Sequence, residues 1–110
     1  MAISITVNNL SSVPILIGGD EEQKKKWLGR LTSEHCTASY CLSEPDAGSD
    51  AASLRTSAVR KGDHYLINGS KAWVSGGAHA GFFTLFATTD PESGHEGITC
   101  FVIPADADGI

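Results

Sequence analysis

The chain has 110 residues, of which 41% are hydrophobic, and this length and composition suit one ordinary domain with a modest apolar core. Eight basic and 13 acidic residues give a net charge of −5, and this acidic balance argues against a nucleic-acid-binding protein. Cys36, Cys41 and Cys100 are odd in number and lack the spacing of a disulfide framework, so we expect free thiols in a reducing compartment.

The amino-terminal segment carries no basic leader and no long apolar run, so we expect neither a signal or transit peptide nor a membrane span. Residues 3–17 are apolar but poorly periodic, and a proline interrupts them, so this pattern alone does not separate helix from strand. Asp20 follows, with Gln23 three residues later, a spacing typical of a helix cap. We therefore expect a helix from Asp20 to about Leu28, with Gly29 loosening its end.

After a polar linker, the pattern changes to short strand-like runs separated by turn residues, which predicts an antiparallel β domain. The expected strands are 38–42, 55–59, 64–67, 71–75, 82–88 and 98–103. Asn68-Gly69 is expected to form one of the tight turns between them. The side chains expected to close the sheet faces are Leu42, Leu66, Val74, Phe83, Leu85, Phe101 and Ile103.

The segment Tyr40–Asp50 is expected to pass from a strand into a loop, because its first residues suit a pleated surface while Pro45 and Gly48 interrupt the pattern. Ser43 places a hydroxyl at the strand end, and the closing Gly-Ser-Asp offers backbone N–H groups that a large planar or phosphorylated ligand can approach. The loop contains no lysine or arginine, which excludes a P-loop. Taken alone, these residues also describe an ordinary capped turn.

A second segment, Asn68–Gly77, carries Trp73 and Ser75 on one face of an expected strand. An indole beside a hydroxyl suits a flat heteroaromatic ring, whereas Trp73 by itself is typical of a core aromatic. The four histidines are scattered singly, without the close spacing of metal ligands, so we expect no metal site. Cys41 lies in an expected strand, where a small buried hydrophobe is commoner than a nucleophile.

These two segments resemble the flavin-binding middle domain of the acyl-CoA dehydrogenases, whose signature is matched by Cys41–Asp50, and the likeness extends over nearly the whole chain. Ser75 replaces the commoner threonine, and the details look most like short-chain and branched-chain, isobutyryl-like members. The resemblance implies an α+β fold. Residues 1–35 would be the end of a helical amino-terminal domain, and residues 36–110 a flavin-binding antiparallel β domain, an incomplete barrel. It also implies an internal fragment given a starting methionine.

The resemblance assigns cofactor contacts to residues of both segments, namely Tyr40, Cys41, Leu42, Ser43, Gly48, Ser49, Trp73, Val74 and Ser75. Leu42 and Ser43 would meet the pyrimidine side of the flavin. Ser49 would touch the diphosphate of FAD and also lie near the acyl-CoA substrate. Trp73 would pack against the isoalloxazine ring, and the hydroxyl of Ser75 would reach its N5 region.

The implied reaction is α,β-dehydrogenation of an acyl-CoA thioester, in which a glutamate removes the α-proton and hydride passes to FAD. In the family this base belongs to the C-terminal helical domain, so we expect no catalytic carboxylate in this chain and no activity from the chain alone. The resemblance also implies electron-transfer flavoprotein as acceptor and a homotetrameric parent. The implied location is the mitochondrial matrix in a eukaryote or the cytoplasm in a bacterium.

Two alternatives stay open. An acyl-CoA oxidase or a flavin monooxygenase would share this pocket but handle oxygen differently. A stand-alone β module would bind a partner or nothing, and a chain that gains no flavin absorbance on titration with the cofactor would favour it.

Overall fold

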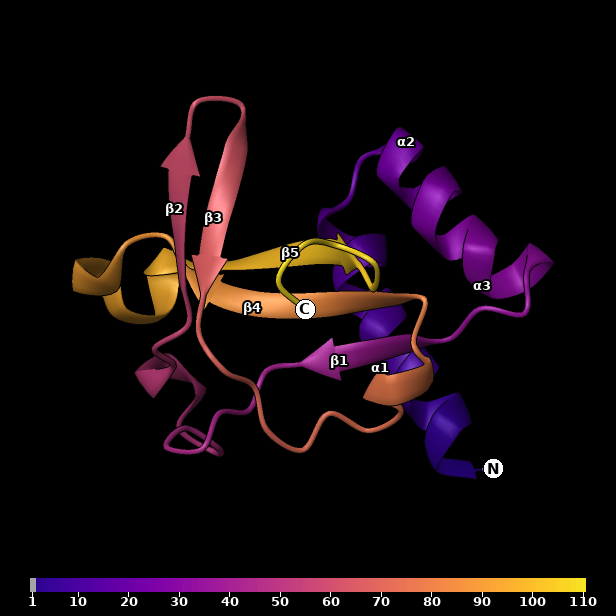
Figure 1. Cartoon of the computed structure of the whole chain (residues 1–110), viewed down its shortest axis with the longest axis horizontal. Coiled ribbons are helices and arrows are strands. Elements are labelled where there is room, and N and C mark those ends of the chain that lie inside the picture. Colours follow the sequence, from indigo (N-terminus) through magenta and orange to yellow (C-terminus); the bar gives the residue numbers. More distant parts are fainter. Residues whose placement is uncertain (1) are drawn as a thin grey trace. The chain divides into compact units, whose positions relative to one another are not determined.

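The computed structural model describes residues 2–110 and shows an α+β fold, which confirms the expected class (Figure 1). The helical segments are α1 (Ala2–Gly18), α2 (Glu21–Gln23), the π-helical turn η1 (Lys24–Leu28), α3 (Gly29–Ser33), and the short 3-10 helices η2 (Ala51–Ser53), η3 (Gly77–His79) and η4 (Pro91–Gly97). The strands are β1 (Ala38–Cys41), β2 (Ser57–Lys61), β3 (His64–Asn68), β4 (Phe82–Thr88) and β5 (Ile98–Pro104). None of the helices within residues 2–110 combines the length and apolar character needed to cross a membrane.

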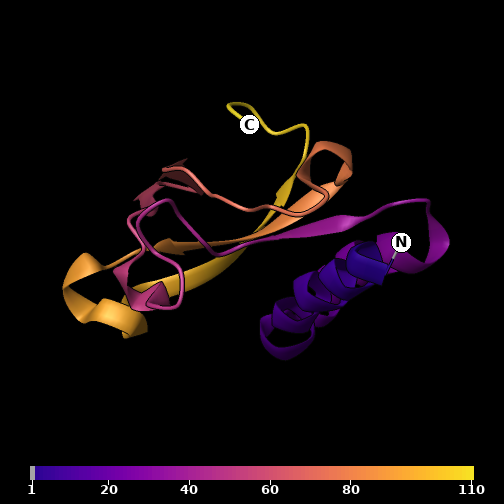
Figure 2. The same ribbon diagram turned by 90° about the horizontal axis from the view of Figure 1, so that it is seen from below.

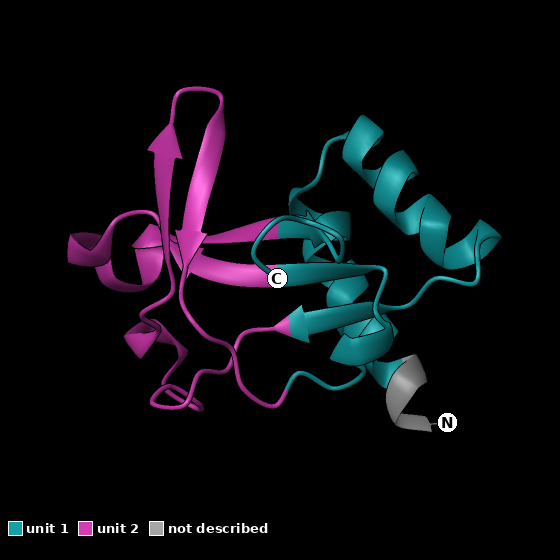
Figure 3. Ribbon diagram, in the orientation of Figure 1, with its two compact units in different colours: residues 1–40, 74–84, 102–110 teal, residues 41–73, 85–101 magenta. Residues whose placement is uncertain are grey.

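The chain divides into two compact units, each built from separate stretches of sequence (Figure 3). Unit 1 comprises residues 1–40, 74–84 and 102–110, and unit 2 comprises residues 41–73 and 85–101. Strands β4 and β5 each contribute residues to both units. The unit boundaries also cut both sequence motifs, because they fall after Tyr40 and after Trp73.

Unit 1 begins with helices, and the cap predicted at Asp20 is confirmed. The Asp20 carboxylate accepts from the backbone N–H of Gln23 at 2.8 Å, and the Gln23 side chain accepts from the Asp20 N–H at 3.0 Å. This reciprocal pair satisfies two N–H groups that a helix start otherwise leaves without partners. Residues 3–17, for which the pattern left helix and strand open, lie within α1, and η1 packs against that helix (Figure 2).

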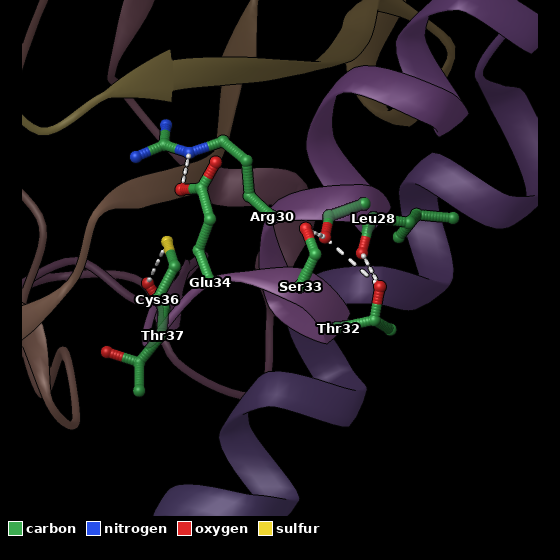
Figure 4. A network of polar contacts seen from close by, with 8 residues as sticks. Leu28, Arg30, Thr32, Ser33, Glu34, Cys36 and Thr37 are labelled. Atoms are coloured by element: carbon green, nitrogen blue, oxygen red, sulfur yellow. Dashed lines mark hydrogen bonds and ion pairs between the residues drawn. The ribbon is translucent and has the colours of Figure 1, made fainter.

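The predicted end of the second helix was wrong, because the helical run continues from η1 through α3 to Ser33. Gly29 has ordinary helical angles, φ −57° and ψ −40°, so it does not loosen the backbone. The following turn is held by side chains: the Ser33 hydroxyl donates to the Gly29 carbonyl at 2.7 Å, and Arg30 pairs with Glu34 at 3.2 Å (Figure 4). These local bonds outweigh the low helix propensity of one glycine.

The apolar core of unit 1 gathers around two aromatic rings. Phe82 is fully buried, and its ring centroid lies 5.1 Å from that of Trp27, at a tilt of 52°. Ile15 and Ala38 complete the buried cluster. The Arg30 guanidinium lies 5.8 Å from the Trp27 ring centroid and 6.0 Å from that of Phe82, within reach of cation–π attraction.

The strands form one sheet in the order β1-β4-β2-β3, with β5 also pairing with β4. Strands β2 and β3 make an antiparallel hairpin from Ser57 opposite Asn68 to Lys61 opposite His64. The sheet is open, and it is mixed because β2 meets β4 in parallel through Ser57 and Thr88. The prediction that neighbouring strands would all be antiparallel is therefore wrong for this pair. The sequence pattern predicted pairing between strands that follow one another, and β2 does pair antiparallel with β3 along its whole length. The parallel contact with β4 involves a single residue pair between strands that are not consecutive.

Three details of the strand prediction were wrong. Residues 71–75 form no strand, and Asn68-Gly69 ends β3 without making a hairpin turn, since the chain turns between β2 and β3. The buried positions of β4 also differ from those expected: Phe82 and Thr84 are buried, whereas Phe83 and Leu85 are half-buried. The Thr84 hydroxyl donates to the carbonyl of Ser11 at 3.1 Å, which explains how a polar side chain occupies an inward position.

The remaining side chains expected to close the sheet faces are also less buried than predicted. Leu66 is 52% exposed, and Leu42, Val74, Phe101 and Ile103 are half-buried. Strand β3 carries mostly exposed side chains, so the β2–β3 hairpin presents apolar groups to solvent rather than to a closed core.

Candidate functional site

The residues expected to contact a cofactor are divided between the two units. Unit 2 holds Cys41, Leu42, Ser43, Gly48, Ser49 and Trp73, and unit 1 holds Tyr40, Val74 and Ser75. Within unit 2 the two sequence motifs meet directly through their backbones. The Ala72 N–H donates to the Ser43 carbonyl at 2.8 Å, so these parts of the two motifs lie side by side.

A buried ion pair reinforces this junction. The Lys71 ammonium lies 2.7 Å from a carboxylate oxygen of Glu44, and both side chains are only 6% exposed. The same ammonium donates to the Leu42 carbonyl at 3.0 Å. One side chain of the second motif is therefore bonded to two residues of the first, on either side of Ser43.

Glu44 has further donors around its carboxylate. One oxygen accepts from the Arg55 N–H at 2.7 Å, and the other accepts from the Thr56 N–H at 2.9 Å and from the Thr56 hydroxyl. Burial alone would raise the pKa of Glu44, but the hydrogen bonds from Lys71, Thr56 and the Arg55 backbone outweigh it and lower the pKa to about 2. The carboxylate is thus held ionised, and a group with so low a pKa is a weak general base near neutral pH.

The turn after β3 fits closely against this cluster. A Cβ atom on Gly69 would lie 2.7 Å from the Cα atom of Thr56, nearer than packed atoms approach. Only glycine therefore leaves Thr56 in the position from which it donates to Glu44. The Asn-Gly pair that was expected to make a hairpin turn instead permits a close approach of two backbones.

Sequence reasoning placed Glu44 and Lys71 inside the two motifs but gave neither a structural role. A partial signal was present: Lys71 is the one charged residue of the second motif, and Glu44 is the acidic residue nearest the expected strand in the first, where a buried charge would need a partner. The pattern contained no indication that the two residues would pair with each other, because 27 positions separate them.

Trp73 lies directly after this junction and has an unusual conformation. Its backbone adopts φ +59°, the left-handed region that non-glycine residues rarely enter, and its side chain is 91% exposed. A backbone strained in this way is typical of residues held for a function. Trp73 is therefore not a core aromatic, the alternative that its residue type alone suggested, and its indole surface is available for stacking.

The loop that follows Glu44 is small, exposed and locally bonded. Glu44 and Ala47 exchange backbone hydrogen bonds at 2.8 and 3.2 Å, which closes a tight turn. Gly48 and Ser49 are exposed, and a Cβ atom on Gly48 would meet nothing within 4 Å. The loop thus offers a small, accessible surface of the kind that a bulky polar ligand can approach.

Cys41 ends β1 in a buried position. Burial raises the pKa of its thiol to about 11, although the nearby Lys71 charge lowers it in part. The thiol is therefore protonated near neutral pH and is no nucleophile. This agrees with the expectation that Cys41 serves packing.

In unit 1, Tyr40 and Val74 are half-buried and Ser75 is exposed. The Ser75 carbonyl accepts from the buried Ser39 hydroxyl at 2.9 Å, which ties the segment after Trp73 to β1. Gly76 follows with φ +75°, a left-handed conformation that suits glycine at this turn.

Comparison with known proteins points to one family in both the sequence-family match and the similar individual proteins. Residues 39–110 match the sequence family described as acyl-CoA dehydrogenase, middle domain. The chain is 43% identical over 113 aligned residues to a probable medium-chain specific acyl-CoA dehydrogenase of Caenorhabditis briggsae, described as mitochondrial; the match covers all of this chain and 28% of the relative.

Solved structures show the same likeness. Butyryl-CoA dehydrogenase from Megasphaera elsdenii matches with a TM-score of 0.93 and 35% identity, over 98% of this chain and 29% of that one. The prolyl acyl carrier protein oxidase AnaB matches with a TM-score of 0.92 and 42% identity, over 96% of this chain and 28% of that one. The chain thus spans between a quarter and a third of the length of the proteins it matches.

Proposed function

This chain belongs to the acyl-CoA dehydrogenase family, and we propose that it supplies flavin and acyl-CoA contacts to an FAD-dependent acyl-CoA dehydrogenase. Residues 1–35 would be the end of the helical amino-terminal domain, and residues 36–110 would belong to the flavin-binding middle domain. The observation that carries the proposal is the exposed indole of Trp73. This side chain is 91% exposed on a strained backbone, and the preceding residue, Ala72, donates its N–H to the Ser43 carbonyl. An exposed aromatic plane, on a segment bonded to the one that carries the half-buried Ser43, suits a flat polar heterocycle.

The chain's own groups would divide the binding of FAD as follows. Leu42 and Ser43 would meet the pyrimidine side of the ring, with Cys41 packing behind them, while the exposed Gly48 and Ser49 would approach the diphosphate. Ser49 would also contact the acyl-CoA substrate. Bound FAD would supply the hydride acceptor for α,β-dehydrogenation.

In unit 2, Trp73 would provide the stacking surface for the ring. The resemblance also assigns cofactor contacts to Tyr40, Val74 and Ser75 of unit 1, with Ser75 acting through its hydroxyl. We propose no catalytic base in this chain. Glu44 is buried, fully engaged by donors and held at a pKa of about 2, so it is poorly suited to removing a proton from a thioester.

The wider activity follows from the family as a proposal. An acyl-CoA would be the substrate, electron-transfer flavoprotein the acceptor and a homotetramer the assembled parent. A mitochondrial matrix location in a eukaryote accords with the mitochondrial relative, and a bacterial parent would be cytoplasmic. A short or branched acyl chain of the isobutyryl type is the substrate we would test first.

A second candidate is favoured by the match to the prolyl acyl carrier protein oxidase. In that case the parent would use oxygen as the acceptor. Parallel assays of the parent enzyme, one with an artificial electron acceptor and one following hydrogen peroxide formation, separate the two reactions.

Titration of the chain with FAD tests the proposed binding. We expect flavin absorbance to remain with the chain after gel filtration, and Trp73→Ala to weaken its retention. Tyr65→Ala serves as the control, because Tyr65 is another exposed aromatic of unit 2 that the proposal leaves unused. Equal retention by both variants would contradict the role of Trp73, and no retention by the unaltered chain would contradict the proposed function.

A further inference from the structure

The buried pair of Glu44 and Lys71 has no part in the proposed chemistry, yet it joins the two segments that would face the flavin. We propose that Glu44, Lys71 and Thr56 form a positioning cluster that sets the distance between Ser43 and Trp73. This inference rests on the proposed function, because its purpose is to hold a ring between those two residues.

Ser43 and Trp73, the two residues proposed to face the flavin, each lie next to residues held by hydrogen bonds between the two segments. The Lys71 ammonium binds the Leu42 carbonyl at 3.0 Å and the Glu44 carboxylate at 2.7 Å, so it bonds to both neighbours of Ser43. On the other segment, the Ala72 N–H binds the Ser43 carbonyl at 2.8 Å, and Trp73 is the next residue. A shift of either segment would therefore break a hydrogen bond made by Ser43 itself or by a residue next to Ser43 or Trp73.

The cluster is also anchored at its far side. Thr56 donates to Glu44 through both its N–H and its hydroxyl, and Arg55 donates through its backbone. Gly69 leaves room for Thr56, since a Cβ atom there would overlap it. Glu44 is thus held in place by Arg55 and Thr56, the two residues before β2. Lys71 bonds to Glu44, and this bond in turn fixes the segment that carries Trp73.

The Glu44–Lys71 pair contributes more to positioning than to net stability. A buried ion pair recovers little more than the cost of removing its charges from water, and neutral replacement of both partners is often tolerated. A pair retained inside such a network is therefore better explained by the geometry that it specifies. Unit 2 offers a contrast in Asp46 and Arg55, which lie 3.7 Å apart with both side chains largely exposed and so fix little.

The test uses the 110-residue chain and four variants: Glu44→Gln/Lys71→Met, Thr56→Val, Asp46→Asn and Tyr65→Ala. The double variant removes both charges while Gln keeps an acceptor for Thr56 and Met keeps the length of Lys71. Thr56→Val removes only the hydroxyl and preserves the shape. The readouts are the thermal midpoint, the dissociation constant for FAD, and the visible circular dichroism of the bound flavin, which reports a ring fixed in asymmetric surroundings.

We expect the double variant to keep a thermal midpoint within a few degrees of the unaltered chain but to bind FAD roughly tenfold more weakly, with the flavin dichroism lost. Thr56→Val should show a smaller loss in the same direction, and Asp46→Asn and Tyr65→Ala should change neither flavin readout. If the double variant fails to fold, Thr56→Val alone decides. Unchanged affinity and dichroism in the folded variants would overturn the inference while leaving the proposed function intact. An unaltered chain that binds no FAD would overturn both.

Discussion

The two units of this chain are stabilised by different kinds of interior. Unit 1 buries large apolar groups, with Phe82 fully enclosed against Trp27. Unit 2 also buries apolar groups, chiefly Leu54 and three alanines, but its interior includes the charged side chains of Glu44 and Lys71, and its largest fully buried side chain is Thr56. Apolar burial contributes stability with little directional preference, whereas hydrogen-bonded charges require defined distances and angles. The comparison indicates that the aromatic core of unit 1 contributes mainly stability, whereas the buried charges of unit 2 also fix the positions of the residues around them.

The largest effect should come from the core of unit 1. Phe82→Ala is expected to lower the free energy of unfolding by about 3–5 kcal/mol, because it removes a fully buried ring and leaves a cavity beside Trp27. Denaturant unfolding followed by circular dichroism measures it. Phe83→Ala is the matched control, since Phe83 is the next residue of β4 and only half-buried. An equal or larger loss in the control would break the assignment of the core.

Acid should act on unit 2. The pKa of Glu44 falls from its usual 4.5 to about 2 on folding, so its contribution is complete above pH 4.5 and is lost as the pH falls towards 2. We expect the free energy of unfolding to drop by roughly 2–3 kcal/mol over that window because of this group. Lys71 is the cation that faces the carboxylate.

The control for the acid effect is Glu44→Gln, whose side chain does not titrate. The other carboxylates act in both proteins, so the difference between the two pH profiles isolates Glu44. Parallel profiles between pH 4.5 and 2 would mean that the ion pair gives unit 2 no pH-dependent stability.

A third experiment sharpens the close packing in unit 2. Gly69→Ala is expected to cost about 1–3 kcal/mol, because the new methyl group would overlap Thr56. Gly48→Ala, at a position where a Cβ atom meets nothing within 4 Å, is expected to change stability by less than about 0.5 kcal/mol. Equal midpoints of urea unfolding for the two variants would show that Thr56 moves aside freely.

The smallest expected effect has the opposite sign. Gly29 has helical angles and open space around its missing Cβ atom, so Gly29→Ala should stabilise the helix of unit 1 by about 0.5–1 kcal/mol. A rise in the thermal midpoint, with unchanged flavin binding, is the expected observation. A destabilised variant would indicate that Gly29 is needed as glycine for a reason outside the helix.

Local patterns in the sequence predicted local structure well. The cap at Asp20 is confirmed because it depends on residues three positions apart, and β4 has the predicted bounds because its apolar run is flanked by turn residues. The continuation through Gly29 was missed because the Ser33 hydroxyl bonds back to the Gly29 carbonyl and Arg30 pairs with Glu34, side-chain interactions that propensity alone does not include.

Long-range pairing was beyond the sequence. Residues 71–75 alternate like a strand, but their partners include the Ser43 carbonyl, the Glu44 carboxylate and the Ser39 hydroxyl rather than a strand ladder. The motifs themselves were sufficient for the family and the fold class. The ion pair that joins them appears only when residues far apart in sequence are brought together.

The Glu44–Lys71 pair also constrains how this protein can evolve. A change at Glu44 alone leaves a buried cation, and a change at Lys71 alone leaves a buried anion; either intermediate is expected to lose about 3–5 kcal/mol. Because domains have only about 5–15 kcal/mol to lose, selection would remove most such intermediates. The two positions should therefore change together in evolution: related sequences should either keep both charges or have replaced both.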